Sequence, residues 1–135
     1  MNILLDTNAY VAFKGGDPAV LEVIRLADEV HVRTVVLGEL LAGFALGTRE
    51  AANRCELSAF LDSPRVTVLS VNEETASFYA AIFGRLRAKA RPIPTNDLWL
   101  AATALQHGCP LATYDAHFEA VDGLRIVKQP EDLLF

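Results

Sequence analysis

The sequence has few of the residues that brace small secreted domains or bind zinc. Its 135 residues include only two cysteines, Cys55 and Cys109, which lie far apart and form no CxxC pair. We expect both side chains to be small buried hydrophobic groups, since neither a disulfide framework nor a zinc knuckle is indicated. The histidines also lack metal-ligand spacing, and GxSxG, GxGxxG and GxxxxGK[ST] patterns are absent. These absences disfavour a serine hydrolase, a Rossmann cofactor site and a nucleotide-binding loop.

Long apolar runs and an excess of positive charge are also missing. No stretch approaches the roughly 18 apolar residues of a membrane span, and no basic segment with an apolar core and cleavage site opens the chain. We therefore expect a cytoplasmic protein with no membrane partner, folded as a single domain over residues 1–135. The formal net charge of −5 by itself argues against a nucleic-acid ligand, because phosphates are repelled.

The first predicted strand ends at a carboxylate. Ile3, Leu4 and Leu5 are three consecutive large apolar residues, which is typical of a strand covered on both faces, and Asp6 follows them directly. In open α/β sheets ligands bind at the C-terminal edge of the strands, where Asp6 would lie. Taken alone, an Asp after a strand is more often a turn or cap residue.

Strand and helix patterns alternate through the rest of the chain. Asp17 before Pro18 is typical of a helix start, Thr34 and Asn72 are expected to cap two later helices, and Gly108 is expected to end the last long one. The expected strands cover 2–8, with the apolar run ending at Asp6, then 30–33, 66–71, 111–113 and 124–127. The expected helices cover 9–14, 18–28, 35–46, 49–62, 73 to about 91, and 97–107 with Thr95 or Asn96 as its cap. Residues 130–135 are expected to be a tail. This order predicts an α/β fold of three layers, α/β/α, with a central, mostly parallel sheet of about five strands.

Three further acids are expected at the same edge of the sheet. Glu39 lies in the second turn of helix 35–46, and Asp97 opens the last long helix. Asp115 follows the strand 111–113, which comes after that helix. Because the neighbours of Glu39 are apolar, we expect its side chain to face inward, where either a buried salt bridge or a function must compensate the charge. An Asp in a first helical turn is commonplace by itself.

Together the four acids indicate a metal site. Four converging carboxylates would repel one another strongly unless divalent cations bound between them. Hard oxygen ligands select Mg²⁺ or Mn²⁺, and such sites usually serve phosphoryl chemistry.

The sequence resembles a known family, the PIN-domain ribonucleases, and within it the VapC toxins of type II toxin–antitoxin pairs. The matching segments are LLDTN at residues 4–8, Thr34 with Glu39 and Leu40, NDLWLAATAL at 96–105, and LATYDAHF at 111–118. They follow the family's order over most of the chain. The resemblance implies a PIN-like fold and a metal site formed by four acids, Asp6, Glu39, Asp97 and Asp115, with Asn8 and Thr113 in supporting roles.

The implied activity is Mg²⁺-dependent endoribonuclease cleavage of RNA phosphodiester bonds, with Mn²⁺ able to substitute. Two bound divalent cations would offset four negative charges and so weaken the objection from net charge. Four cations lie before the loop at 92–96, namely Arg85, Arg87, Lys89 and Arg91. They are commonly a solvated helix terminus, but we hypothesise that Arg91, with Lys89, contacts RNA phosphates. The resemblance also implies a homodimer and a VapB-like antitoxin partner, with which the 52% apolar composition is compatible.

Two other function classes remain open at this stage. Aspartyl-phosphate phosphotransferases also place an Asp after the first strand, but they usually need a second acid where this chain has Asn8. A non-catalytic PIN-like scaffold would bind RNA or protein without cutting. Retention of all four acids argues against the scaffold.

Overall fold

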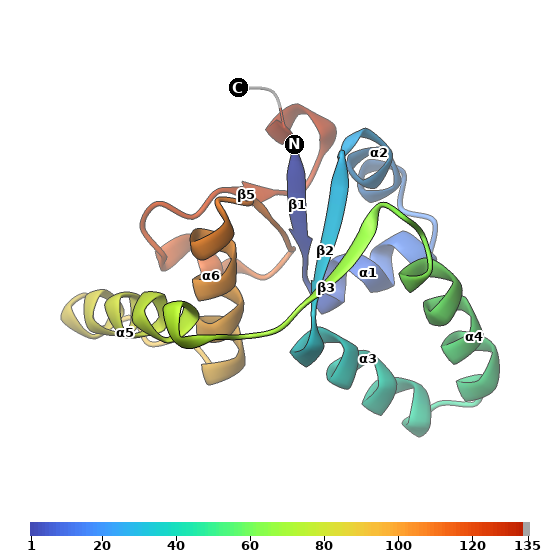
Figure 1. Ribbon diagram of the computed structural model, residues 1–135, viewed down its shortest axis with the longest axis horizontal. Helices are drawn as coiled ribbons and strands as arrows, with labels where there is room; N and C mark the ends of the chain where they lie inside the picture. The colour runs from blue at the N-terminus through green and yellow to red at the C-terminus, as the bar shows by residue number, and fades with distance from the viewer. Residues whose placement is uncertain (134–135) are drawn as a thin grey trace.

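A five-stranded parallel sheet is the centre of the fold (Figure 1). The structure is a computed structural model, and it describes residues 1–133. The strands are β1 (Asn2–Leu5), β2 (Glu29–Arg33), β3 (Val66–Leu69), β4 (Leu111–Ala112) and β5 (Ile126–Val127). Their order is β3-β2-β1-β4-β5, and every neighbouring pair is parallel. The expected parallel α/β sheet is confirmed, although β1, β3, β4 and β5 are each shorter than expected.

Helices cover both faces of this sheet, which confirms the three-layer arrangement (Figure 1). They are α1 (Thr7–Lys14), α2 (Pro18–Leu26), α3 (Thr34–Leu46), α4 (Glu50–Leu61), α5 (Glu73–Ala88) and α6 (Thr95–His107), with short 3₁₀ helices η1 (Ala116–Ala120) and η2 (Pro130–Leu133). The α5–α6 pair lies on one side of the sheet, and α1 to α4 lie on the other. In the described part of the chain, no helix is both long and apolar enough to cross a membrane.

Some helix boundaries follow the expected caps and others do not. Asn72 and Thr75 form a reciprocal capping box at the start of α5, and Gly108 ends α6 in the left-handed conformation. The expected cap at Thr34 is wrong, because this residue is already helical and its hydroxyl lies 3.4 Å from the carbonyl oxygen of Leu69. The caps expected from Thr95 or Asn96 are also wrong, because α6 begins directly after Pro94 without a side-chain cap.

The core is mostly apolar, and the polar residues buried with it are Asp6, Arg33, Thr75, Thr103 and Thr113. Arg33 ends β2 and is only 4% exposed. Its Nη1 donates to the carbonyl oxygen of Trp99 and to the Thr103 hydroxyl, both at 2.8 Å, and burial lowers the pKa of its guanidinium. No carboxylate in residues 1–133 lies within ion-pair distance of it. Arg33 therefore ties the sheet edge to α6, the helix that carries Asp97. The expected burial of both cysteines is wrong for Cys55, which is exposed on α4.

The helices α5 and α6 are both followed by a residue with a left-handed backbone, and this pair allows a matched test of what that conformation does to stability. Ala90 follows α5 at φ 55°, and Gly108 follows α6 at φ 63°. A Cβ disfavours this conformation, so we expect Ala90→Gly to raise the free energy of unfolding by about 1 kcal/mol. Gly108→Ala should lower it by about 1 to 2 kcal/mol, since a Cβ there would meet no atom within 4 Å and only the backbone is strained. Urea denaturation measures both, and changes of the same sign would contradict the explanation.

Candidate metal centre

The sheet register brings the ends of β1 and β4 side by side. Leu5 pairs with Ala112, and the Asp6 backbone N–H donates to the Ala112 carbonyl oxygen at 3.0 Å. The residues that follow these two strands are therefore adjacent. The buried Thr113 hydroxyl donates to Oδ2 of Asp6 at 2.7 Å.

Asp6 is held from two sides and is only 7% exposed. Its Oδ1 accepts from the backbone N–H of Thr7 at 2.7 Å, which caps α1. Burial raises the pKa of the Asp6 carboxyl above its ordinary value, and hydrogen bonds from Thr113 and Thr7 act in the opposite direction. The charges of Asp97 and Glu39 raise the Asp6 pKa further. The carboxylate of Asp6 thus lacks a compensating positive charge.

Asn8 and Thr113 connect the end of β1 to the chain that follows β4. Thr113 Oγ1 accepts from the backbone N–H of Asp115 at 3.0 Å and lies 3.4 Å from Nδ2 of Asn8. Oδ1 of Asn8 accepts from the backbone N–H of Tyr114 at 3.0 Å. Thr113 thus contacts Asp6 and the Asp115 backbone directly, whereas Asn8 contacts Thr113 and the Tyr114 backbone, and the supporting role of both residues stays a prediction.

Glu39 lies at the site, but its expected inward orientation is wrong. Its side chain is exposed on α3, and Oε1 accepts from the Thr7 hydroxyl at 2.8 Å. The face of α3 that carries Glu39 also carries Ala42, Gly43 and Leu46, all exposed. This apolar face exists as the sequence indicates, but no element of residues 1–133 covers it, so no buried salt bridge is needed.

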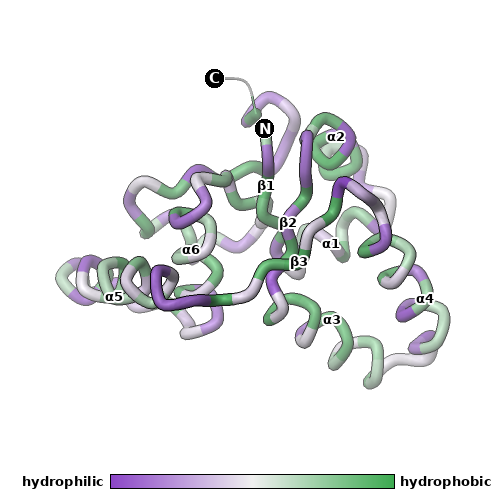
Figure 2. Tube along the Cα trace, viewed as in Figure 1, coloured by the Kyte–Doolittle hydropathy of each residue, from purple (hydrophilic) through white to green (hydrophobic). Residues whose placement is uncertain are grey.

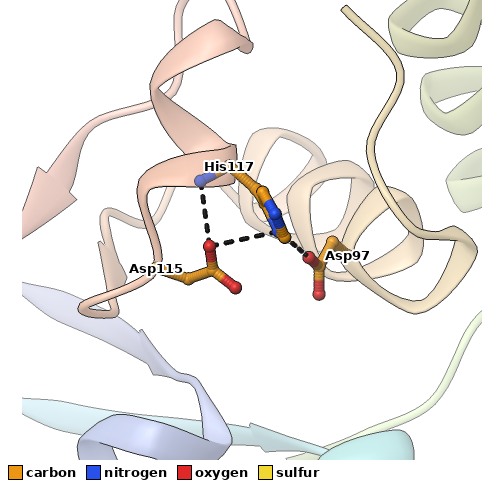
Figure 3. Close-up of side chains that lie close together, drawn as sticks. All are labelled: Asp97, Asp115 and His117. Atoms are coloured by element: carbon orange, nitrogen blue, oxygen red, sulfur yellow. Dashed lines mark hydrogen bonds and ion pairs between the residues drawn. The ribbon is translucent and has the colours of Figure 1, made fainter.

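Asp97 and Asp115 meet at a histidine (Figure 3). Nδ1 of His117 lies 3.1 Å from Oδ2 of Asp97 and 3.1 Å from Oδ1 of Asp115. Oδ1 of Asp115 also accepts from the backbone N–H of His117 at 2.9 Å and so caps η1. Burial raises the pKa of the Asp97 carboxyl, the hydrogen bond from His117 lowers it, and the charge of Asp115 raises it.

All four predicted acids line one open groove of about 380 Å³. Its walls are formed by Asp6, Thr7, Asn8, Val11, Glu39, Asp97 and Asp115. Carboxylate oxygens are the ligands that hard divalent cations prefer, and a cation would supply the positive charge that these acids lack. The residues present therefore fit a divalent metal ion. Asp6 and Asp97 are the least exposed of the acids, which suits ligands held in fixed positions.

The two predicted RNA-binding cations differ in their surroundings. Nζ of Lys89 contacts Oδ1 of Asp122 at 2.6 Å and the Ala120 carbonyl oxygen at 3.0 Å. Arg91 is exposed in the loop between α5 and α6, and its guanidinium has no ion-pair partner in the described residues. Arg91 is thus the more available of the two.

Thr7 lines the groove and His117 contacts two of its acids, and neither residue was identified from the sequence. Thr7 orients Glu39, and its place directly after Asp6 was the only indication of this role. His117 was set aside because the histidines lack metal-ligand spacing. Its position two residues after Asp115 brings it back to the site only because η1 turns the chain there.

Comparison with known proteins agrees with this geometry. The PIN domain family matches residues 3–124. Ribonuclease VapC4 of Mycobacterium tuberculosis (strain ATCC 25618 / H37Rv) is 35% identical over 101 residues, which cover 73% of this chain and 76% of that protein. Ribonuclease VapC5 of the same strain is 31% identical over 126 residues, which cover 93% and 91%. The chain belongs to the PIN-domain family, among the VapC proteins.

Solved structures share the fold. VapBC2 from Rickettsia felis, bound to a DNA fragment from its promoter, gives a TM-score of 0.82 at 23% identity, covering 93% of this chain and 97% of that one. VapBC-5 from Mycobacterium tuberculosis, a toxin–antitoxin system, gives 0.75 at 27% identity with the same coverage. The three-layer arrangement is that of these proteins.

The raised pKa of Asp6 predicts how stability depends on pH. Between the unfolded-state pKa and the higher folded-state pKa the folded protein binds more protons, so this group makes the protein less stable as pH rises through that window. Asn cannot ionise but still accepts at an N-cap. In EDTA, Asp6→Asn should therefore be more stable than the wild type at pH 7, and the gain should shrink as the pH falls. Urea denaturation at several pH values measures this.

Asp17→Asn is the matched control for that experiment, because Asp17 also caps a helix but lies outside the groove. It should give no comparable gain at pH 7. If Asp6→Asn is no more stable than the wild type at pH 7, or if its gain in stability grows as the pH falls, the raised pKa of Asp6 is contradicted.

Proposed function

We propose that this chain is a Mg²⁺-dependent endoribonuclease, the toxin of a VapBC-type pair, acting as a single PIN domain over residues 1–135. The observation that carries the proposal is the convergence of four acids from separate parts of the chain on one groove. The names of the related proteins, ribonucleases VapC4 and VapC5, support RNA as the substrate class.

The residues of the groove have distinct proposed roles. Asp6 and Asp97 hold the principal metal ion, and Glu39 and Asp115 complete the site. Thr113 and Asn8 fix the acids through the hydrogen bonds described above. When bound, Mg²⁺ lowers the pKa of bound water and polarises the phosphate, and Mn²⁺ has the same preference for oxygen. The open groove admits an RNA backbone.

The proposed partners are a second copy of this chain and a VapB-like antitoxin, and the proposed location is the cytoplasm. Apolar side chains left on the surface support such partners. Leu46 on α3 is 91% exposed and Phe83 on α5 is 47% exposed, and Figure 2 shows α3 as apolar along most of its length. The related solved structures of VapBC assemblies support an antitoxin as one partner.

Removing one acid should abolish cleavage without unfolding the protein. We expect Asp97→Asn to reduce Mg²⁺-dependent cleavage of a mixed RNA substrate by at least about 100-fold, and EDTA to stop the wild type. Glu50→Gln, an exposed acid on α4 outside the groove, is the control and should leave the rate unchanged. Equal cleavage by all variants would indicate a contaminant. Binding of RNA without cleavage, even with Mn²⁺, would instead favour the non-catalytic scaffold.

Arg91 should contribute to RNA affinity through a phosphate contact. We expect Arg91→Ala to weaken binding to single-stranded RNA and to reduce the slope of log affinity against log salt by about 0.7, the value for one phosphate contact. Lys89→Ala should have a smaller effect because Lys89 is paired with Asp122. Arg54→Ala on α4 is the matched exposed control. Filter binding with Asp97→Asn as the inactive background measures all three, and an unchanged salt slope for Arg91→Ala would refute the contact.

A further inference from the structure

We propose that His117 is a metal ligand, which gives the Asp97–Asp115 side of the groove a preference for nitrogen-seeking divalent ions such as Zn²⁺ over Mg²⁺. The inference rests on the proposed function, because it concerns the same metal site. Among residues 1–133, these three residues form the group whose ligand atoms all lie within 4.8 Å of one another (Figure 3).

The spacing of the ligand atoms suits a bound ion. Nδ1 of His117 lies 3.1 Å from an oxygen of each aspartate. Two neighbouring ligands are about 3.0 Å apart around an octahedral ion with bonds of about 2.1 Å, and about 3.3 Å apart around a tetrahedral ion with bonds of about 2.0 Å. The two separations from His117 fall between these values, and the two aspartate oxygens lie within 4.8 Å of each other. The imidazole nitrogen is therefore placed to share an ion with either carboxylate.

The backbone of His117 is held beside Asp115, because its N–H donates to Oδ1 of Asp115 at the start of η1. The imidazole ring lies between the carboxylates of Asp115 and Asp97 (Figure 3). A neutral imidazole can bind a metal ion through the lone pair of Nδ1, with the ring hydrogen on Nε2.

The type of ligand atom, nitrogen or oxygen, then determines which metal ion the site prefers. Mg²⁺ prefers oxygen and usually retains several waters, whereas imidazole nitrogen suits Zn²⁺ and other transition ions. Removing His117 takes away a ligand that Mg²⁺ does not need, while Asp97 and Asp115 remain. Replacing His117 should therefore weaken Zn²⁺ binding and leave Mg²⁺ binding nearly unchanged.

Calorimetric titration of the metal-free protein with Zn²⁺ and, separately, with Mg²⁺ tests the assignment. We expect His117→Asn to weaken Zn²⁺ binding at least about tenfold and to change Mg²⁺ binding less than about twofold. Asp97→Asn should weaken both ions. The side chain of His117 is 52% exposed, so its replacement should not prevent folding, and far-UV circular dichroism verifies this.

His107→Asn is the control for Zn²⁺ binding at another place, where histidine and cysteine side chains lie near one another. His107 is exposed, and its ring contacts that of His31, whose Nδ1 lies 3.9 Å from the sulfur of Cys109. Zn²⁺ affinity lost in His107→Asn but retained in His117→Asn would overturn the proposal. Equal losses of Zn²⁺ and Mg²⁺ in His117→Asn would also overturn it, since His117 would then only position the carboxylates. A wild type that binds neither ion would refute both this inference and the proposed metal-dependent function.

Discussion

Repulsion among carboxylates at one edge of the sheet is the constraint on which the site depends. Burial and neighbouring acids raise the pKa of both Asp6 and Asp97. The groups that offset this are mainly neutral hydrogen-bond donors, such as the hydroxyl of Thr113 and the backbone N–H of Thr7. Neutral donors fix the direction of a carboxylate but do not cancel its charge. The folded chain therefore keeps negative charge available to bind a cation, and this uncompensated charge lowers its free energy of unfolding.

The hydrogen bonds of Arg33 agree with a site whose acids are left without a protein cation. Arg33 is buried at the end of β2, and its guanidinium donates to Trp99 and Thr103 on α6 rather than to a carboxylate. A permanent ion pair with Asp6 or Asp97 would compete with a divalent cation for the same oxygens. By bonding α6 instead, Arg33 holds the helix that presents Asp97 and leaves the acids free.

How far the sequence predicts the site depends on how each residue reaches it. Asp6 and Asp115 follow strands whose apolar runs are plain in the sequence, and parallel register makes their convergence predictable. The inward orientation of Glu39 was not predictable in the same way, because an apolar helical face indicates burial but not whether this chain or a partner provides it. His117 was missed because the histidines lack metal-ligand spacing along the chain, and only the turn at η1 brings its ring next to Asp115 and Asp97.

The exposed apolar face of α3 leads along the helix to the groove. Glu39 and Leu46 are seven residues apart, so they lie on the same side of the helix, with Ala42 and Gly43 between them. A partner that covers Leu46 along this face would therefore extend to Glu39, whose carboxylate lines the metal groove. Apolar burial would supply the affinity, while a single basic group at the Glu39 end would satisfy the carboxylate and exclude a cation. An antitoxin that binds in this way needs no change in the fold to block the site, since recognition and inhibition would use one continuous surface.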